Sequence, residues 1–325
     1  MRFRVLVTAT SFGKVSDRAK RLLESAGCDL LHNPYGRPYT EMELQEAVAG
    51  IDGIIAGVDH FSEAVMARAD NLRVIARRGV GVDGVDLRAA TKQGILVTNT
   101  PGANSKAVAD LVLAVMLAVS RGLLSSVAAL QGGRWVRPLG HELGGKTLGL
   151  LGLGRIGREV ARRASGFGMR LLAHDPFWPA GEAKELGVSQ ASQDEVLREA
   201  DYLSLHLPLT PETEGLIGEP QLRAMRKTAY LINTARGELV QEEVLVTALQ
   251  ENWIAGAALD VFRQEPPFGS PLLSLPNLLP TPHLASQTEE AVEAMDMGAA
   301  ENLLAVLKGQ RPPHLVNPDV WPKSV

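Results

Sequence analysis

The feature that most constrains this chain is a glycine motif between two apolar segments. The apolar run 147–151 before the motif is typical of a buried strand, and the amphipathic run 155–167 after it is typical of a helix. A second apolar run, 169–173, ends close to Asp175, which lies roughly 20 residues beyond the motif. The glycines of this G-x-G-x-x-G pattern are Gly152, Gly154 and Gly157. The arrangement predicts a βαβ unit that binds a dinucleotide.

Each part of this unit has a physical role. Gly152 permits a tight turn, Gly154 lets the backbone approach a pyrophosphate, and Gly157 lets the helix pack closely on the strand. The helix N-terminus offers free N–H groups and the positive end of the helix dipole. Asp175 can accept hydrogen bonds from both ribose hydroxyls and would repel a 2′-phosphate, so the sequence favours NAD over NADP. Ordinary turn glycines and a strand-end aspartate are the alternative, and the strand–helix–strand context argues against it.

Composition and charge exclude several classes of partner. The chain has 325 residues, enough for two domains, and is 45% hydrophobic and 22% charged. Its net charge of −4 argues against a nucleic-acid-binding surface. Cys28 is the only cysteine, which rules out an intrachain disulfide and fits a reducing compartment. The N-terminal apolar run is too short for a signal peptide, and the apolar run 109–119 is too short to span a bilayer. We therefore expect a cytoplasmic protein with no membrane or nucleic-acid partner, and we assign no metal site.

The first hundred residues alternate short apolar runs with amphipathic ones, which predicts a parallel sheet with helices on both faces. Thr40 and Glu43 have the spacing of a capping box at a helix start. The predicted strands are 4–8, 29–32, 53–56, 73–76 and 96–98, and the other predicted helices are 15–26, 63–69 and 87–93.

The remainder continues the alternation around the glycine motif. We predict a helix over about 105–124, a glycine-rich excursion over 131–145 and a final helix over 289–308. We expect the final helix to return to the first domain, because the connections near 98–105 and 283–289 are long enough for two crossings. The strands predicted after the glycine motif are 169–174, 202–205, 229–233, 256–260 and 278–282.

Three titratable or charged residues follow apolar strands in the second half: Arg236, Glu265 and His283. Ligands of open parallel sheets bind beyond the carboxyl ends of the strands, so these residues are expected to converge beside the dinucleotide. Each residue alone has an ordinary explanation, as a surface ion-pair partner or a loop residue. The coincidence of all three with the glycine motif favours a catalytic site.

The three side chains suit hydride transfer to a 2-keto acid. The reduced carbonyl needs a proton, which histidine exchanges near neutral pH. Glu265 would stabilise the imidazolium of His283, and Arg236 would bind the substrate carboxylate and polarise the keto oxygen. The segment 78–83, RGVGVD, is a glycine loop of the first domain whose backbone N–H groups could bind the same carboxylate.

Several segments in this order resemble the D-isomer-specific 2-hydroxyacid dehydrogenases. They are GLLGLGRIGREV, INTARGELV, AALDVFRQEPP and TPHLAS, with RRGVGVDGVDL and NTPGANSKAVADLVLAVMLA before them. The resemblance covers nearly the whole chain and is closest to D-3-phosphoglycerate dehydrogenases and similar enzymes. It implies two doubly wound α/β domains in a homodimer: a flavodoxin-like substrate domain (1–100 plus 288–325) and an inserted Rossmann NAD domain (101–287). A dimerisation arm is expected near 121–146.

The same resemblance implies roles for individual residues. Arg236 would bind and polarise the substrate, His283 would be the acid/base, and Glu265 would be its partner. The implied substrate contacts also include Arg78, Val80 and Gly81. The implied cofactor contacts, besides the three glycines, are Arg155 and Ile156 at the pyrophosphate, Asp175 at the adenosine ribose, His206, Leu207 and Pro208 at the adenine, and Thr234, Ala235 and Asp260 at the nicotinamide.

Departures from the phosphoglycerate dehydrogenases leave the substrate open. The chain has no counterpart of the C-terminal regulatory extension of the long type, and Ala56-Gly57 stands where many of these enzymes carry a phosphate-binding arginine. Arg77 and Arg78 remain as candidate ligands of an anionic group. Phosphoglycerate is the first expectation, and hydroxypyruvate or glyoxylate fits about as well. The rivals are an NAD-sensing corepressor of the C-terminal-binding-protein type and formate dehydrogenase, which resembles this fold but has glutamine where Glu265 stands.

Overall fold

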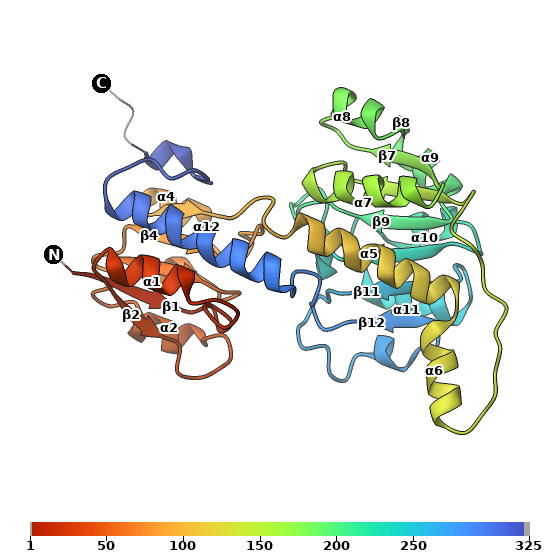
Figure 1. The fold of residues 1–325 in the computed structure, drawn as a ribbon, viewed down its shortest axis with the longest axis horizontal. Coiled ribbons are helices and arrows are strands. Elements are labelled where there is room, and N and C mark those ends of the chain that lie inside the picture. The colour runs from red at the N-terminus through yellow and green to blue at the C-terminus, as the bar shows by residue number, and fades with distance from the viewer. Residues whose placement is uncertain (1, 322–325) are drawn as a thin grey trace. The chain divides into compact units, whose positions relative to one another are not determined.

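The computed structural model describes residues 2–321 and divides the chain into two compact units (Figure 1). Unit 1 combines the residues up to Asn104 with those from Gln287 onward, and unit 2 is Ser105–Ser286. Each unit is a parallel sheet with helices on both faces. The prediction of two doubly wound α/β domains is confirmed.

Unit 1 contains a five-stranded sheet in the order β2-β1-β3-β4-β5, which is the flavodoxin-like order. All its strand pairs are parallel. The strands are β1 (Phe3–Val7), β2 (Cys28–His32), β3 (Gly53–Ala56), β4 (Val74–Arg77) and β5 (Leu96–Thr98). The helices are α1 (Arg18–Ser25), α2 (Glu41–Ala47), α3 (Glu63–Met66), α4 (Leu87–Lys92) and α12 (Glu289–Leu307), followed by the 3-10 turn η3 (Pro318–Val320).

The two faces of this sheet follow from the alternation of side chains along each strand. Val5 and Val7 of β1 belong to a core that includes α1 and α12, whereas Leu6 belongs to a core that includes α2, α3 and α4. The C-terminal helix α12 contributes Leu303 to the first of these cores and contacts β3, β4 and β5. Unit 1 is therefore assembled from both ends of the chain.

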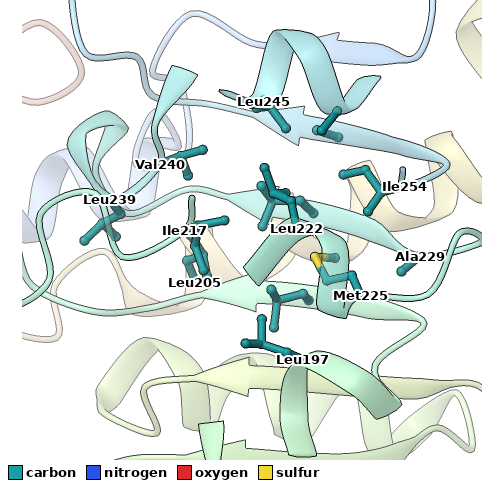
Figure 2. Close-up of a cluster of buried hydrophobic side chains, with 14 of the residues drawn as sticks. Leu197, Leu205, Ile217, Leu222, Met225, Ala229, Leu239, Val240, Leu245 and Ile254 are labelled. Atoms are coloured by element: carbon teal, nitrogen blue, oxygen red, sulfur yellow. The ribbon is translucent and has the colours of Figure 1, made fainter. Parts of the chain in front are cut away.

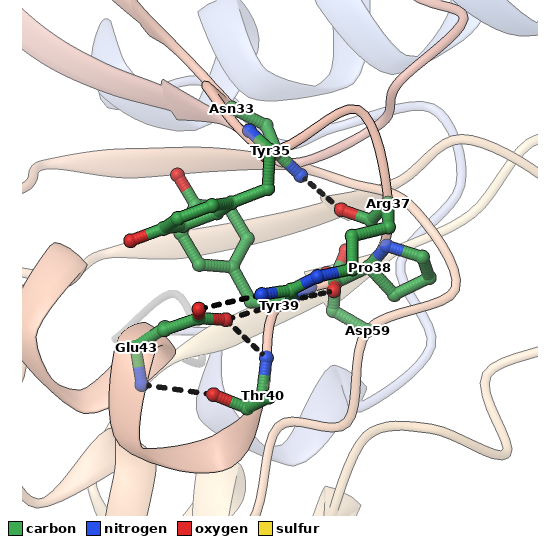
Figure 3. A network of polar contacts seen from close by, with 8 residues as sticks. All are labelled: Asn33, Tyr35, Arg37, Pro38, Tyr39, Thr40, Glu43 and Asp59. Carbon is green, nitrogen blue, oxygen red and sulfur yellow. Dashed lines mark hydrogen bonds and ion pairs between the residues drawn. The ribbon is translucent and has the colours of Figure 1, made fainter.

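Helix α2 begins with the capping box that the sequence predicts. The Thr40 hydroxyl accepts from the Glu43 amide, and the Glu43 carboxylate accepts from the Thr40 amide at 2.8 Å. Arg37 pairs with the same carboxylate at 2.7 Å, and the Tyr39 amide donates to Asp59 at 2.8 Å (Figure 3). This network fixes the chain between β2 and α2.

Unit 2 contains a seven-stranded parallel sheet in the order β12-β11-β10-β9-β6-β7-β8. The strands are β6 (Thr147–Leu151), β7 (Arg170–His174), β8 (Val188–Gln190), β9 (Tyr202–Leu205), β10 (Tyr230–Asn233), β11 (Gly256–Leu259) and β12 (Leu278–Pro280). The helices are α5 (Ser105–Ser120), α6 (Leu123–Gln131), α7 (Arg155–Gly166), α8 (Ala180–Glu185), α9 (Gln193–Glu199), α10 (Glu219–Ala224) and α11 (Glu242–Gln250), with 3-10 turns η1 (Gly237–Leu239) and η2 (Pro271–Ser274). Strand β8 is the one strand of this sheet that the sequence analysis missed.

Two apolar cores cover the faces of this sheet. Leu148 and Leu150 of β6 pack with α5 and α7, whereas the alternate residue Leu151 packs with α9, α10 and α11. Figure 2 shows part of the second core, in which Leu222 and Leu245 are fully buried. Burying one such leucine contributes about 1.5–3 kcal/mol. These cores hold the strand ends, and therefore the site residues, in a fixed arrangement.

The predicted helix over 105–124 is wrong at its C-terminal end. Helix α5 ends at Ser120, and Gly122 adopts φ 56 before α6 begins at Leu123. A left-handed residue interrupts helical hydrogen bonding, so the chain bends by 63°. Among the described residues no single helix is long and apolar enough to cross a membrane. The bent pair of α5 and α6, taken together, reaches the length and apolar composition of such a span.

Candidate active site

The glycine turn lies where the strand order of unit 2 reverses, between β6 and β9. Such a reversal is the point at which doubly wound sheets bind their ligands. Gly152 follows β6 and has φ 97, and a Cβ on it would lie 2.5 Å from the carbonyl oxygen of His206. The amide of His206, directly after β9, donates to the Leu151 carbonyl at 2.8 Å. Only glycine fits this turn, because both its conformation and the adjacent chain exclude a side chain.

The N-terminus of α7 fits a pyrophosphate. A Cβ on Gly157 would lie 2.3 Å from the Gly152 carbonyl oxygen, so the helix packs on the turn through glycine. Gly154 is the N-cap, has no side-chain capping bond, and faces open space where a Cβ would lie. Arg155 and Ile156 therefore begin the helix with amides that no side chain caps, which is the arrangement that binds phosphate groups.

Asp175 stands after β7 and braces the glycine turn. Its Oδ2 accepts from the Leu153 amide at 2.7 Å, and its Oδ1 accepts from the Phe177 amide at 2.8 Å. The carboxylate is half-buried. It therefore stands beside the turn at which a dinucleotide would bind, with a negative charge available to hydroxyl donors.

The segment after β9 presents a neutral surface. Burial lowers the pKa of His206 to about 4, so its ring is uncharged at neutral pH. The ring Nε2 lies 2.9 Å from the Ser204 hydroxyl. Leu207 packs on the edge of the core and comes close to Gly152, and Pro208 is exposed. These properties are compatible with an uncharged heteroaromatic ring.

Arg236 is held at the end of β10 by Asn233, a buried residue that the sequence analysis missed. The Asn233 amide group donates to the Arg236 carbonyl at 2.7 Å, and its Oδ1 accepts from the Ala235 amide at 3.0 Å. Thr234 lies between them with a buried hydroxyl that has no hydrogen-bond partner among the described residues. The residue after Arg236 is Gly237, and a Cβ on Gly237 would lie 2.0 Å from the backbone of Phe262. The sequence signal that could have identified Asn233 is a polar residue at the end of an apolar strand, in the segment INTARG.

His283 and Glu265 form a direct pair. His283 Nδ1 lies 2.8 Å from Glu265 Oε2, and Glu265 Oε1 accepts from the Phe262 amide at 3.1 Å. The two side chains are 45% and 36% exposed, so a substrate can reach them. His283 has φ 50, a conformation uncommon for residues other than glycine. Such a backbone persists only where the surrounding structure fixes it.

Asp260 fixes the backbone conformation of His283. Its Oδ1 accepts from the Thr281 hydroxyl at 2.6 Å and from the Leu284 amide at 2.9 Å, and its Oδ2 accepts from the Ala285 amide at 2.8 Å. The His283 amide donates to the Asp260 carbonyl at 2.9 Å. Asp260 is 2% exposed. The family resemblance implies that Asp260 lies at the nicotinamide; in the structure its carboxylate accepts hydrogen bonds from the loop that carries His283.

The ionisation of Glu265 reflects its neighbours. Burial raises the pKa of this carboxyl, but the hydrogen bond and charge of His283, the Phe262 amide and the charge of Arg236 together bring it below its ordinary value. Glu265 is therefore ionised at neutral pH. Gly237, the residue after Arg236, lies against the backbone of Phe262, and the Phe262 amide donates to Glu265, so Arg236 stands in the same neighbourhood of unit 2 as the pair.

The predicted substrate loop of unit 1 follows β4. Val80 and Gly81 are half-buried, and no acceptor among residues 2–321 takes the amide of either one. Arg78 is 7% exposed, and its Nε donates to Asp296. Arg78 therefore has a buried partner at Nε, whereas its Nη2 is buried with no hydrogen-bond partner among the described residues.

Comparison with known proteins connects this geometry to a family. Residues 113–285 match the family model described as D-isomer specific 2-hydroxyacid dehydrogenase, NAD binding domain. This chain belongs to that family. A glyoxylate reductase of Korarchaeum cryptofilum is 43% identical over 291 residues, covering 87% of this chain and 88% of the relative. It follows that this dehydrogenase is an NAD-dependent oxidoreductase.

Two further relatives bear on this dehydrogenase. A D-3-phosphoglycerate dehydrogenase of Methanocaldococcus jannaschii is 43% identical over 282 residues, and the match covers 86% of this chain but only 54% of that protein. The TT0316 protein of Thermus thermophilus, known from a crystal structure, is 44% identical in sequence to this chain. The structural match covers 97% of this chain and 100% of that protein, with a TM-score of 0.85. The Rossmann and substrate-domain folds of the family are both represented in these matches.

Proposed function

We propose that this dehydrogenase reduces a small 2-keto acid, such as glyoxylate or hydroxypyruvate, to the D-2-hydroxy acid. The observation that carries the proposal is the His283–Glu265 pair, with Arg236 placed near it by the contact of Gly237 with Phe262. A proton donor, its anionic partner and a carboxylate-binding cation are the groups that this reaction requires.

His283 acts as the acid. When NADH is bound at the glycine turn, it supplies the hydride that reaches the keto carbon. Protonated His283 donates Nδ1–H to Glu265 and transfers the proton on Nε2 to the substrate oxygen. The neutral ring that remains keeps its Nδ1–H on Glu265, so the carboxylate fixes both the tautomer and the orientation. Ionised Glu265 also stabilises the imidazolium before the transfer.

Arg236 and the loop of unit 1 bind the substrate. The Arg236 guanidinium forms a fork that matches a carboxylate and draws electron density from the adjacent keto group. The amides of Val80 and Gly81 bind the carboxylate as adjacent donors. In this proposal Arg155 and Ile156 bind the pyrophosphate, Asp175 the ribose, and His206, Leu207 and Pro208 the adenine.

A short substrate is favoured over phosphoglycerate for two reasons. The strand end at Ala56-Gly57 offers no cation to a phosphate, and the Nε of Arg78 is paired with Asp296. Several relatives that match most of this chain are named glyoxylate reductase. Phosphoglycerate stays the second candidate, supported by the Methanocaldococcus jannaschii relative.

A substrate screen tests this choice. NADH oxidation is followed with glyoxylate, hydroxypyruvate, pyruvate and phosphohydroxypyruvate under one set of conditions. We expect kcat/KM for glyoxylate or hydroxypyruvate to exceed that for phosphohydroxypyruvate by about tenfold or more, equivalent to about 1.4 kcal/mol. A preference for phosphohydroxypyruvate would replace the first candidate with the second.

We also propose that the enzyme is a cytoplasmic homodimer whose interface includes α6 and the segment after it. Large apolar side chains are exposed there, and apolar patches of this kind mark protein interfaces. They are Leu123, Leu124, Val127, Leu130, Trp135, Val136 and Leu139. Sedimentation equilibrium of the wild type and of Leu124→Asp tests the proposal, since a dimer that uses this face would dissociate in the variant.

A further inference from the structure

A buried ion pair joins the end of β4 to the C-terminal helix. Arg78 and Asp296 are 7% and 2% exposed, and Arg78 Nε donates to Asp296 Oδ1. The second oxygen, Oδ2, accepts from the Gly13 amide at 2.8 Å. Asp296 therefore fastens two loops, the one after β1 and the one after β4, to α12.

The pair stands directly before the loop Gly79-Val80-Gly81, whose backbone is held from several sides. The Arg78 amide donates to the Ala56 carbonyl at 3.0 Å. The Gly79 carbonyl accepts from the Thr100 amide at 2.9 Å, and the Val80 carbonyl accepts from the Asn99 side chain at 2.8 Å. Gly79 has φ 148, so the chain takes a path here that a larger residue would resist.

These contacts determine which groups of the loop stay available. Both carbonyls are used within unit 1, whereas the adjacent amides of Val80 and Gly81 have no acceptor among residues 2–321. Successive backbone amides that have no internal acceptor are the groups with which loops bind anions. Asp296 offsets the charge of Arg78 and holds its Nε, which anchors the backbone directly before the two amides. The Nη2 of Arg78 is buried and has no hydrogen-bond partner among the described residues.

We infer that Arg78 and Asp296 are positioning residues that hold the Val80 and Gly81 amides in the orientation that binds the substrate carboxylate. The inference rests on the proposed function, because that proposal assigns the carboxylate to these amides. It differs from the sequence expectation, in which Arg78 itself contacts the substrate. The pair acts on substrate affinity through the loop, and the cofactor site belongs to unit 2.

Steady-state kinetics of Asp296→Asn and Arg78→Met test the inference on the full-length enzyme with NADH and its best 2-keto acid. We expect KM for the keto acid to rise about tenfold or more in each variant, while KM for NADH stays within about twofold of wild type. The control is Glu293→Gln on α12, the helix that carries Asp296, which breaks a surface ion pair with Arg18 of α1. We expect this control to have the wild-type KM for the keto acid and for NADH.

A double variant separates positioning from simple stabilisation. Replacing a buried ion pair by apolar residues often preserves stability, so Arg78→Met/Asp296→Leu should remain folded even where a single variant does not. The inference predicts that its thermal midpoint returns toward wild type while KM for the keto acid stays raised. A wild-type KM in the folded double variant, or in either folded single variant, would overturn the inference and leave the proposed function intact. A wild-type enzyme that turns over no 2-keto acid would overturn both.

Discussion

His283 Nδ1 and Glu265 Oε2 lie 2.8 Å apart, at the ends of two loops that leave neighbouring strands β11 and β12. The contact uses one ring nitrogen of the histidine and leaves the other for a substrate. The proposed chemistry depends on this division, because an acceptor that holds Nδ1–H leaves Nε2 as the nitrogen that exchanges a proton with the substrate.

The ionisation of Glu265 makes part of the stability of the fold depend on pH. Its pKa is lowered on folding from the ordinary 4.5, so the unfolded state binds the proton more readily. The resulting stability is present above the unfolded pKa and is lost as pH falls through the folded value. We predict that Glu265→Gln has a lower thermal midpoint than wild type at neutral pH and that the difference disappears in acid. Thermal unfolding from pH 7 to pH values below 4.5 measures it, and a difference that does not change with pH would contradict the account.

Asp175 should set the choice between NAD and NADP. Its carboxylate stands at the glycine turn, bonded to the Leu153 amide, and would repel a 2′-phosphate. We predict that Asp175→Ser shifts the ratio of kcat/KM for NADPH over NADH upward by about tenfold, or about 1.4 kcal/mol. Comparison of the two cofactors at a fixed keto-acid concentration gives the ratio. An unchanged ratio would mean that residues other than Asp175 determine the preference for NAD over NADP.

Two glycines of α7 give a matched pair of substitutions. Gly157→Ala places a Cβ 2.3 Å from the Gly152 carbonyl oxygen, whereas Gly166→Ala places one in open space. We predict that Gly157→Ala loses about 1–3 kcal/mol of stability from overpacking and binds NADH more weakly. Gly166→Ala should gain roughly 0.5–1 kcal/mol, because alanine is the better helix former. Denaturant unfolding and NADH titration of both variants test this, and equal effects at the two positions would refute it.

Much of this fold could be predicted from local patterns. The strands Gly53–Ala56, Leu96–Thr98, Thr147–Leu151 and Tyr202–Leu205 begin and end where the apolar runs do, because parallel strands buried on both faces read as continuous apolar segments. The edge strand β8 was missed since it is short and only Val188 is buried. The end of α5 was misplaced because glycine tolerates helical conformations as well, and Gly122 becomes a break only through its φ of 56.

The residues of the candidate site could be predicted from the sequence, but the hydrogen bonds that hold them in place could not. Arg236, Glu265 and His283 stand at strand ends, which topology alone brings to one edge of the sheet. The roles of Asn233 and Asp260 depend on hydrogen bonds to loops, and those bonds depend on backbone positions that no periodicity encodes. The pairing of Arg78 with Asp296 joins residues that lie far apart in the sequence and likewise has no local signal.

The most direct test of the account is the turnover of His283→Ala with NADH and the best 2-keto acid. The account predicts that kcat falls by roughly 10²–10⁴-fold, as expected for loss of a general acid, while the Kd for NADH stays within about twofold of wild type. His32→Ala, which alters an exposed histidine of the edge strand β2, should leave both values unchanged. Turnover of His283→Ala close to that of wild type would contradict the central claim that this histidine delivers the proton.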